Sequence, residues 1–220
     1  MQGIWTTERI RAAEERLLAI TPEGALMHRA AFAVSVQAAK MLTGRRVVLL
    51  VGAGNNGGDA LWAGAFLRKR GIGVTAVLLK PERAHPAGLA ALRKAGGRIV
   101  GVEDGPRWIR QADLVIDGIV GLSARGPLRA DAAALVAEIS APVLAVDLPS
   151  GVDPDNGSVP GPAVTATRTV TFGARKPVHV LNPERCGEVV FVDIGLRLED
   201  PDLWQLDAAD VGQCGKSDYV

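Results

Sequence analysis

The chain has 220 residues, of which 48% are apolar and 4% aromatic, a composition that suits one α/β domain with a substantial core. Its 25 Lys and Arg residues nearly balance its 24 Asp and Glu residues, and the net charge of +1 argues against a basic nucleic-acid-binding surface. No apolar run approaches membrane-spanning length, and the charged opening segment does not suit a signal peptide. The two cysteines form no C-x-x-C pair and the histidines lack zinc spacing, so we expect a reducing, cytoplasmic setting.

Two helices are expected at the start of the chain. The first covers residues 6–20, where one helical stripe gathers the apolar side chains Ile10, Ala13, Leu17 and Leu18. The second covers residues 23–42, which are apolar around most of the helix circumference and therefore predict a largely buried helix. Gly44 is expected to lie beyond its end.

Short apolar runs then alternate with helical patterns. The expected strands are residues 47–51, 74–79, 98–102, 114–117 and 143–146, and the expected helices lie near 59–70, 86–95, 106–111 and 130–139. Two later strand-like runs, 168–174 and 187–195, are joined by a loop with two prolines, and the tail from about Glu199 is polar and weakly patterned. The alternation predicts an α/β fold, a Rossmann-like three-layer sandwich with a mostly parallel sheet and helices on both faces.

Three polar loops follow the ends of predicted strands. They comprise residues 52–60, 117–127 and 147–153. Because ligands bind beyond the carboxyl ends of the strands in an open parallel sheet, we expect the three loops to line one crevice.

The first loop contains G-x-G-x-x-G in a strand–turn–helix context, at Gly52, Gly54 and Gly57. Loop N–H groups and a helix N-terminus could bind the phosphates of a dinucleotide there, although a glycine-rich turn without a ligand is the alternative. A hydride-transfer site would also need an acidic residue at the end of the second strand. That strand ends at Lys80, with Glu82 only beyond it, which disfavours a conventional NAD-dependent oxidoreductase.

The other two loops carry ionisable and hydroxyl side chains. Arg125 could bind a phosphate or be a solvated surface residue, and Asp117 could be a ligand or a turn residue. Asp147 follows an apolar run directly, which suits a general acid or base facing the crevice. Ser150 lacks the G-x-S-x-G context and a histidine partner, so we expect a ligand or cap rather than a nucleophile.

Taken together, these segments resemble the NAD(P)H-hydrate epimerase family, also called the YjeF N-terminal domain family. The matching segments are GNNGGDA (54–60), Asp117 with Gly121, AVDLPSGVD (145–153), TVTFGARKP (169–177) and CGEVVFVDIG (186–195). The resemblance implies a Rossmann-like isomerase, usually a homodimer, that interconverts the R and S hydrates of NADH and NADPH. A stereospecific dehydratase can then restore the cofactor.

The resemblance also implies which residues act. Substrate contacts are assigned to Asn55, Asn56, Gly57, Gly58, Asp59, Gly121, Leu122, Ser123, Ala124, Arg125, Gly126, Pro127 and Asp147. One K⁺ per subunit is assigned to the oxygen ligands of Asn56, Asp117 and Ser150.

We expect Asp147 to be the catalytic acid/base of the epimerisation. The ring nitrogen can expel the hydroxyl group through a planar iminium, which water attacks from the opposite face; ring opening stays open as an alternative. A nearby cation favours the carboxylate and thus the role of a base. Lys80 or Lys176 could assist, with no position assigned to either.

We expect residues 1–205 to form the epimerase domain and residues 206–220 to be a linker or the start of an ADP-dependent dehydratase domain. The expected partners are the hydrated cofactors, a second subunit and a fused or separate dehydratase, without nucleic acid or membrane. The alternative function is a non-catalytic nucleotide-binding or scaffold module of the same fold. The sequence leaves the preference between NADH and NADPH hydrates open.

Overall fold

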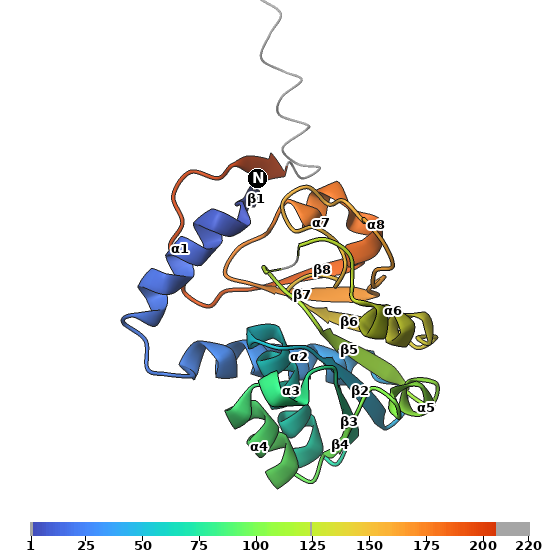
Figure 1. Ribbon diagram of the computed structural model, residues 1–220. Helices are drawn as coiled ribbons and strands as arrows, with labels where there is room; N and C mark the ends of the chain where they lie inside the picture. The colour runs from blue at the N-terminus through green and yellow to red at the C-terminus, as the bar shows by residue number, and fades with distance from the viewer. Residues whose placement is uncertain (1, 124, 206–220) are drawn as a thin grey trace, which may run out of the picture.

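A seven-stranded sheet forms the centre of the fold (Figure 1). The computed structural model describes residues 2–123 and 125–205. In spatial order the strands are β4 (Arg98–Val100), β3 (Gly73–Leu78), β2 (Arg46–Val51), β5 (Leu114–Gly118), β6 (Val143–Val146), β7 (Arg168–Phe172) and β8 (Glu188–Val192). Every neighbouring pair is parallel, so the predicted α/β fold is confirmed and the sheet is parallel throughout.

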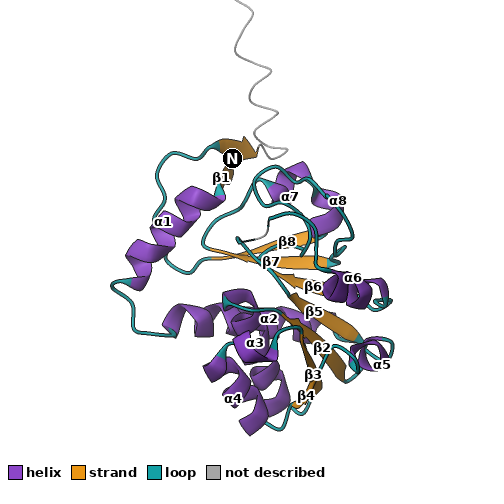
Figure 2. Ribbon diagram, viewed as in Figure 1, coloured by secondary structure: helices purple, strands orange, loops and turns teal. Residues whose placement is uncertain are grey.

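Both faces of the sheet are covered by helices, as the pattern of β2 illustrates. Val47 and Leu49 pack in one apolar cluster, whereas Val48 and Leu50 pack in another, because successive strand side chains point to opposite faces. The first cluster includes residues of α2 (Ala25–Met41), α3 (Asn55–Lys69) and α4 (Pro86–Lys94), and the second those of α5 (Gly105–Ile109) and α6 (Ala130–Ala137). Figure 2 shows these two helical layers on opposite sides of the strands, which confirms the three-layer sandwich.

Some element boundaries differ from the prediction. Helix α3 begins at Asn55 rather than near Asp59, so the polar residues of the first loop form the first turn of a helix. The segment between β7 and β8 is not a plain loop, since it contains the short helices α7 (Val178–Leu181) and α8 (Pro183–Cys186). Proline is accepted at the start of α8 because the first helical N–H has no intrahelical partner.

The two ends of the described chain lie side by side. Strand β1 (Gln2–Ile4) pairs antiparallel with β9 (Leu203–Gln205), within the tail that was expected to be weakly patterned. A parallel bridge from Ile4 to Arg175 joins β1 to the segment that follows β7. Figure 1 shows β9 beside β1, from which α1 (Thr7–Leu18) continues.

Helix α1 buries only part of its predicted apolar stripe. Ile10 and Ala13 are buried, but Leu18 is 54% exposed. Leu18 belongs to the last turn, where it borders a cavity instead of the core. Within the described residues, no helix is both long and apolar enough to cross a membrane. The predicted linker, residues 206–220, lies outside the described residues.

Candidate functional site

Asp147 and Lys176 form a buried ion pair at the carboxyl edge of the sheet. Asp147 follows β6 directly, and its backbone φ of 72° is in the left-handed region that side chains other than glycine rarely adopt. Its carboxylate pairs with the Nζ of Lys176, whose side chain is 1% exposed. Thr171 accepts a hydrogen bond from that Nζ at 2.8 Å and its hydroxyl lies 3.2 Å from Asp147 Oδ1. Uncommon backbone geometry beside a buried ion pair is typical of functional sites.

His179 holds both members of the pair through their backbones. The N–H of Lys176 donates to His179 Nδ1 at 3.1 Å, and Nε2 lies 3.0 Å from the carbonyl oxygen of Asp147. Because Nδ1 accepts, the neutral imidazole carries its proton on Nε2 and donates it to that carbonyl. Burial, followed by the Lys176 ammonium, lowers the pKa of His179 to about 4, which keeps this arrangement at neutral pH. His179 is therefore a positioning residue.

Asp117 is a buried carboxylate at the end of β5. Its Oδ2 accepts from the N–H of Ser150 at 2.8 Å, and its Oδ1 accepts from Ser150 Oγ at 2.7 Å and from the N–H of Ile119 at 3.2 Å. These donors are all neutral, and no cationic side chain of the described residues pairs with Asp117. Burial raises the pKa of Asp117 from 3.8 to about 6. A cation beside this carboxylate would offset the cost of burying its charge.

Asn56 reaches the same region from the first turn of α3. Its Nδ2 donates to the carbonyl of Val146 at 2.7 Å, which leaves Oδ1 directed at the loop after β5. The backbone there is so close that a Cβ on Gly121 would lie 2.2 Å from Asn56 Oδ1. The structure thus gathers amide, carboxylate and hydroxyl oxygens from three strand ends, and hard oxygen donors of this kind fit K⁺.

Asp59 carries an unsatisfied oxygen beside this region. It is 7% exposed, and its Oδ1 has no hydrogen-bond partner among the described residues. Burial raises the pKa of Asp59 well above its usual value, and the Asp147 and Glu14 carboxylates raise it further. Burial likewise raises the pKa of Glu14. An orphaned buried oxygen of this kind calls for a ligand or a proton.

Some of the predicted substrate-binding residues line two cavities instead of one crevice, whereas Asn56, Gly57, Gly58, Gly121, Leu122 and Asp147 line neither. Asn55 and Asp59 line a cavity of about 550 Å³, together with Glu14 and Phe172. A second cavity of about 370 Å³ is lined by Ser123, Arg125, Gly126 and Pro127 of the second loop. The turn into α3 borders both, because Gly52 and Ala53 line the second cavity and Asn55 the first.

Glycines in the first turn of α3 permit close packing. A Cβ on Gly57 would lie 2.3 Å from the carbonyl oxygen of Gly52, and one on Gly58 would lie 2.9 Å from the Met27 side chain. The contact with the Gly52 backbone explains Gly57 by packing, whether or not a phosphate binds, whereas the flexible end of Met27 can move away from a Cβ at position 58.

The loop after β5 is held from α1. The carbonyl of Leu122 accepts from Arg11 Nη2 at 2.7 Å, and Ser123 Oγ accepts from the same nitrogen at 3.3 Å. Arg125 donates to Thr7 Oγ1 at 3.4 Å. Ala124, also predicted to bind substrate, lies outside the described residues.

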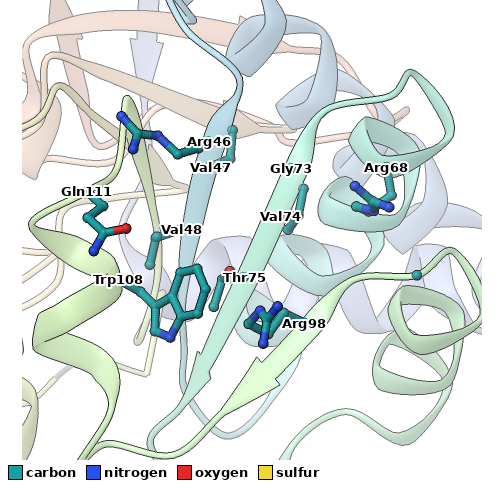
Figure 3. A pocket seen from close by; sticks show the side chains of 11 residues that line it. Arg46, Val47, Val48, Arg68, Gly73, Val74, Thr75, Arg98, Trp108 and Gln111 are labelled. Carbon is teal, nitrogen blue, oxygen red and sulfur yellow. The ribbon is translucent and has the colours of Figure 1, made fainter.

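A further cavity, of about 330 Å³, lies at the opposite edge of the sheet (Figure 3). Arg46 and Arg98 line it, and the Arg98 guanidinium lies 4.7 Å from the centre of the Trp108 ring. None of the predicted site residues line this cavity. The predicted chemistry is therefore concentrated at the carboxyl edge.

A parallel sheet of this order, with a glycine turn after β2 and polar groups beyond the strand ends, defines a Rossmann-like ligand-binding domain. The pattern of the family described as YjeF-related protein N-terminus matches residues 23–178. The chain belongs to this family.

Relatives of known name resemble nearly the whole chain. The bifunctional NAD(P)H-hydrate repair enzyme Nnr of Mycobacterium leprae is 52% identical over 96% of this chain and 45% of its own length. The NAD(P)H-hydrate epimerase of Microbacterium testaceum is 44% identical over 87% of this chain and 78% of its own length. The chain thus spans about half the length of the bifunctional relative. The crystal structure of yeast YNL200c matches with a TM-score of 0.73 at 18% identity, over 94% of this chain and 98% of that one, which shows the same fold.

Proposed function

We propose that the protein is an NAD(P)H-hydrate epimerase, an isomerase that interconverts the R and S hydrates of NADH and NADPH. The main support from the structure is the buried Asp147–Lys176 pair together with Asp59, whose Oδ1 has no partner among the described residues and whose pKa the Asp147 carboxylate helps to raise. The proposed reaction needs two ionisable groups, one that gives a proton to the departing hydroxyl group and one that takes a proton from the incoming water. The names of the relatives favour this function over a non-catalytic module of the same fold.

The proposed reaction places the hydrated ring in the cavity lined by Asp59. Asp59 gives its proton to the hydroxyl group, which leaves as water while the ring nitrogen's electron pair forms a planar iminium. Water then adds to the opposite face and gives a proton to Asp147, whose carboxylate is paired with Lys176. The raised pKa of Asp59 suits the acid, because burial favours its protonated form.

We assign one K⁺ per subunit to Asn56, Asp117 and Ser150. The ion would supply positive charge to the buried Asp117 carboxylate and join three strand ends. Phe172, which lines the Asp59 cavity, would pack beside the ring.

We also propose the setting of this activity. The subunit would act in the cytoplasm as part of a homodimer, with residues 206–220 leading to an ADP-dependent dehydratase domain. The relatives named bifunctional, which are about twice as long as the matched region, support that arrangement.

A coupled assay on a mixture of the R and S hydrates tests the function, and the fraction of the hydrate consumed is the readout. The R and S epimers are added to the protein together with an S-specific dehydratase as reporter, and the spontaneous epimerisation rate is subtracted. An epimerase lets the dehydratase consume the whole pool. A plateau near half, unchanged by more protein, would contradict the proposal and indicate a binding module.

Potassium is expected to stabilise the protein more at pH 8 than at pH 5. The folded-state pKa of Asp117 is about 6, above its ordinary value, so ionising Asp117 costs folding stability as the pH rises through about 6. A bound cation offsets that cost only where the carboxylate is ionised. At 100-fold excess over Kd the stabilisation is about 2.7 kcal/mol.

Thermal unfolding in KCl and in choline chloride of equal ionic strength measures the effect. Asp117→Asn removes the charge and should abolish the response to K⁺ at pH 8. An equal response at both pH values, or one that survives in Asp117→Asn, would remove Asp117 from the cation site.

A further inference from the structure

The second cavity lies where dinucleotide-binding sheets hold the adenosine half of their ligand. It opens beyond three adjacent strands, with Gly52 after β2, Lys80 after β3 and Ile119 after β5. This is the point at which the strand order reverses, and ligands of open α/β sheets bind there. The cavity contains about 370 Å³.

The lining of this cavity is strongly cationic. Lys80, Arg83, Arg125 and Arg129 line it, against the single carboxylate of Asp131. Asp131 Oδ1 accepts from the backbone N–H of Ala132 at 2.8 Å. Arg125 is already engaged, because its Nη2 lies 3.7 Å from an Asp155 carboxylate oxygen.

Lys80, Arg83 and Arg129 are available for a ligand. No carboxylate among residues 2–123 and 125–205 pairs with any of them. A cavity with this excess of positive charge suits an anionic group.

The backbone places Lys80 and Arg83 together. Lys80 directly precedes the 3₁₀ turn η1 (Pro81–Arg83), and its carbonyl accepts from the N–H of Arg83 at 3.0 Å. Lys80 and Arg83 thus lie at the two ends of one short turn, and both line the cavity. Glu82, between them, is exposed and does not line it.

The position of Lys80 determines what such a pair can recognise. In dinucleotide-binding sheets, an acidic residue at the end of the second strand bonds the ribose 2′-hydroxyl, whereas a basic residue nearby accommodates a 2′-phosphate. Here the strand end carries Lys80 with Arg83, a point charge beside a planar fork. A phosphate dianion can take charge-assisted hydrogen bonds from both.

We propose that Lys80 and Arg83 bind the 2′-phosphate of the adenosine ribose, so that the protein prefers hydrated NADPH to hydrated NADH. The preference rests on the proposed epimerase function, but the binding of the phosphate does not. Arg129 faces the same cavity and adds to its positive potential.

The test compares Lys80→Ala/Arg83→Ala with the wild type. A matched variant, Arg93→Ala/Lys94→Ala, removes two exposed positive charges from the last turn of α4, away from the cavity. Initial epimerisation rates give kcat/KM for each hydrate. Calorimetry with adenosine 2′,5′-bisphosphate and with 5′-AMP measures binding without any reaction.

The wild type should have about tenfold higher kcat/KM for the NADPH hydrate, and Lys80→Ala/Arg83→Ala should lose that factor while keeping its rate on the NADH hydrate. The same variant should bind adenosine 2′,5′-bisphosphate about tenfold more weakly and 5′-AMP as before, with the matched variant unchanged in both assays. Equal losses for both hydrates, or equal binding of the two adenosine nucleotides by the wild type, would overturn the proposal. A chain without epimerase activity that still discriminates the two nucleotides through Lys80 and Arg83 would overturn the proposed function alone.

Discussion

Asp147→Asn is expected to slow the interconversion of R and S hydrates by at least about 100-fold, because the amide cannot take the proton that the incoming water releases. Asparagine tolerates the left-handed backbone of this position, where φ is 72°. Its carbonyl oxygen can still accept hydrogen bonds from Lys176 and Thr171. The loss should therefore be in the chemical step. Chiral chromatography of the hydrate during a timed assay measures it.

A surface carboxylate provides the control for Asp147→Asn. Asp104 is exposed and makes no side-chain cap hydrogen bond at the start of α5, so Asp104→Asn should leave the rate unchanged. Nucleotide affinity should be similar in both variants. Undiminished turnover by Asp147→Asn would remove Asp147 from the mechanism.

The strands were predictable because a parallel sheet covered on both faces needs nearly continuous apolar runs. The run Val47–Val51 is buried throughout. Because Gly44 and Gly52 bound a segment too short for a typical helix, the run could be recognised as a strand. The order of loops along the chain then placed Asp117, Asp147 and Ser150 at strand ends. The structure brings Asp117 and Ser150 into contact, as strand-end geometry requires.

The start of α3 was not predictable from local propensity. Two glycines and two asparagines favour a loop, since glycine costs about 1 kcal/mol in a helix relative to alanine. The helix can begin there because Gly57 lets its first turn approach the carbonyl oxygen of Gly52 more closely than a Cβ permits. Tertiary packing has overridden the local preference. The pairing of β1 with β9 was missed for a related reason, because it joins two three-residue strands from opposite ends of the chain.

The side chains that pair with Asp147 could not be predicted from the sequence either. Lys176 was considered but could not be placed, and Thr171 and His179 received no role in the reaction. Thr171 lies in β7, whereas Lys176 and His179 follow Gly173, whose φ of 67° interrupts the strand, so no single strand or helix repeat relates the three residues. Side chains that a turn brings to one site show no regular spacing in the sequence.

Lys176→Met is expected to lower the free energy of unfolding by about 3–5 kcal/mol at pH 8, the usual cost of removing one partner from a buried ion pair. The Asp147 carboxylate would remain buried close to the carboxyl groups of Asp59 and Glu14, with no ammonium to offset its charge. At pH 5.5 the loss should be smaller, because burial raises the pKa values of Glu14 and Asp59, and protonating those two carboxyl groups removes negative charge near Asp147. Urea unfolding at both pH values measures the difference.

The double variant Asp147→Asn/Lys176→Met separates charge from packing. It removes both charges together, and removing a buried pair as a unit is often nearly neutral, so most of the stability lost in Lys176→Met should return at pH 8. The double variant should nevertheless stay inactive, because it lacks the group that takes the proton. If instead it is as unstable as Lys176→Met at both pH values, the stability comes from the hydrogen bonds that Lys176 Nζ donates to Thr171 Oγ1 and to the Phe172 carbonyl, and the ion pair serves the reaction without supporting the fold.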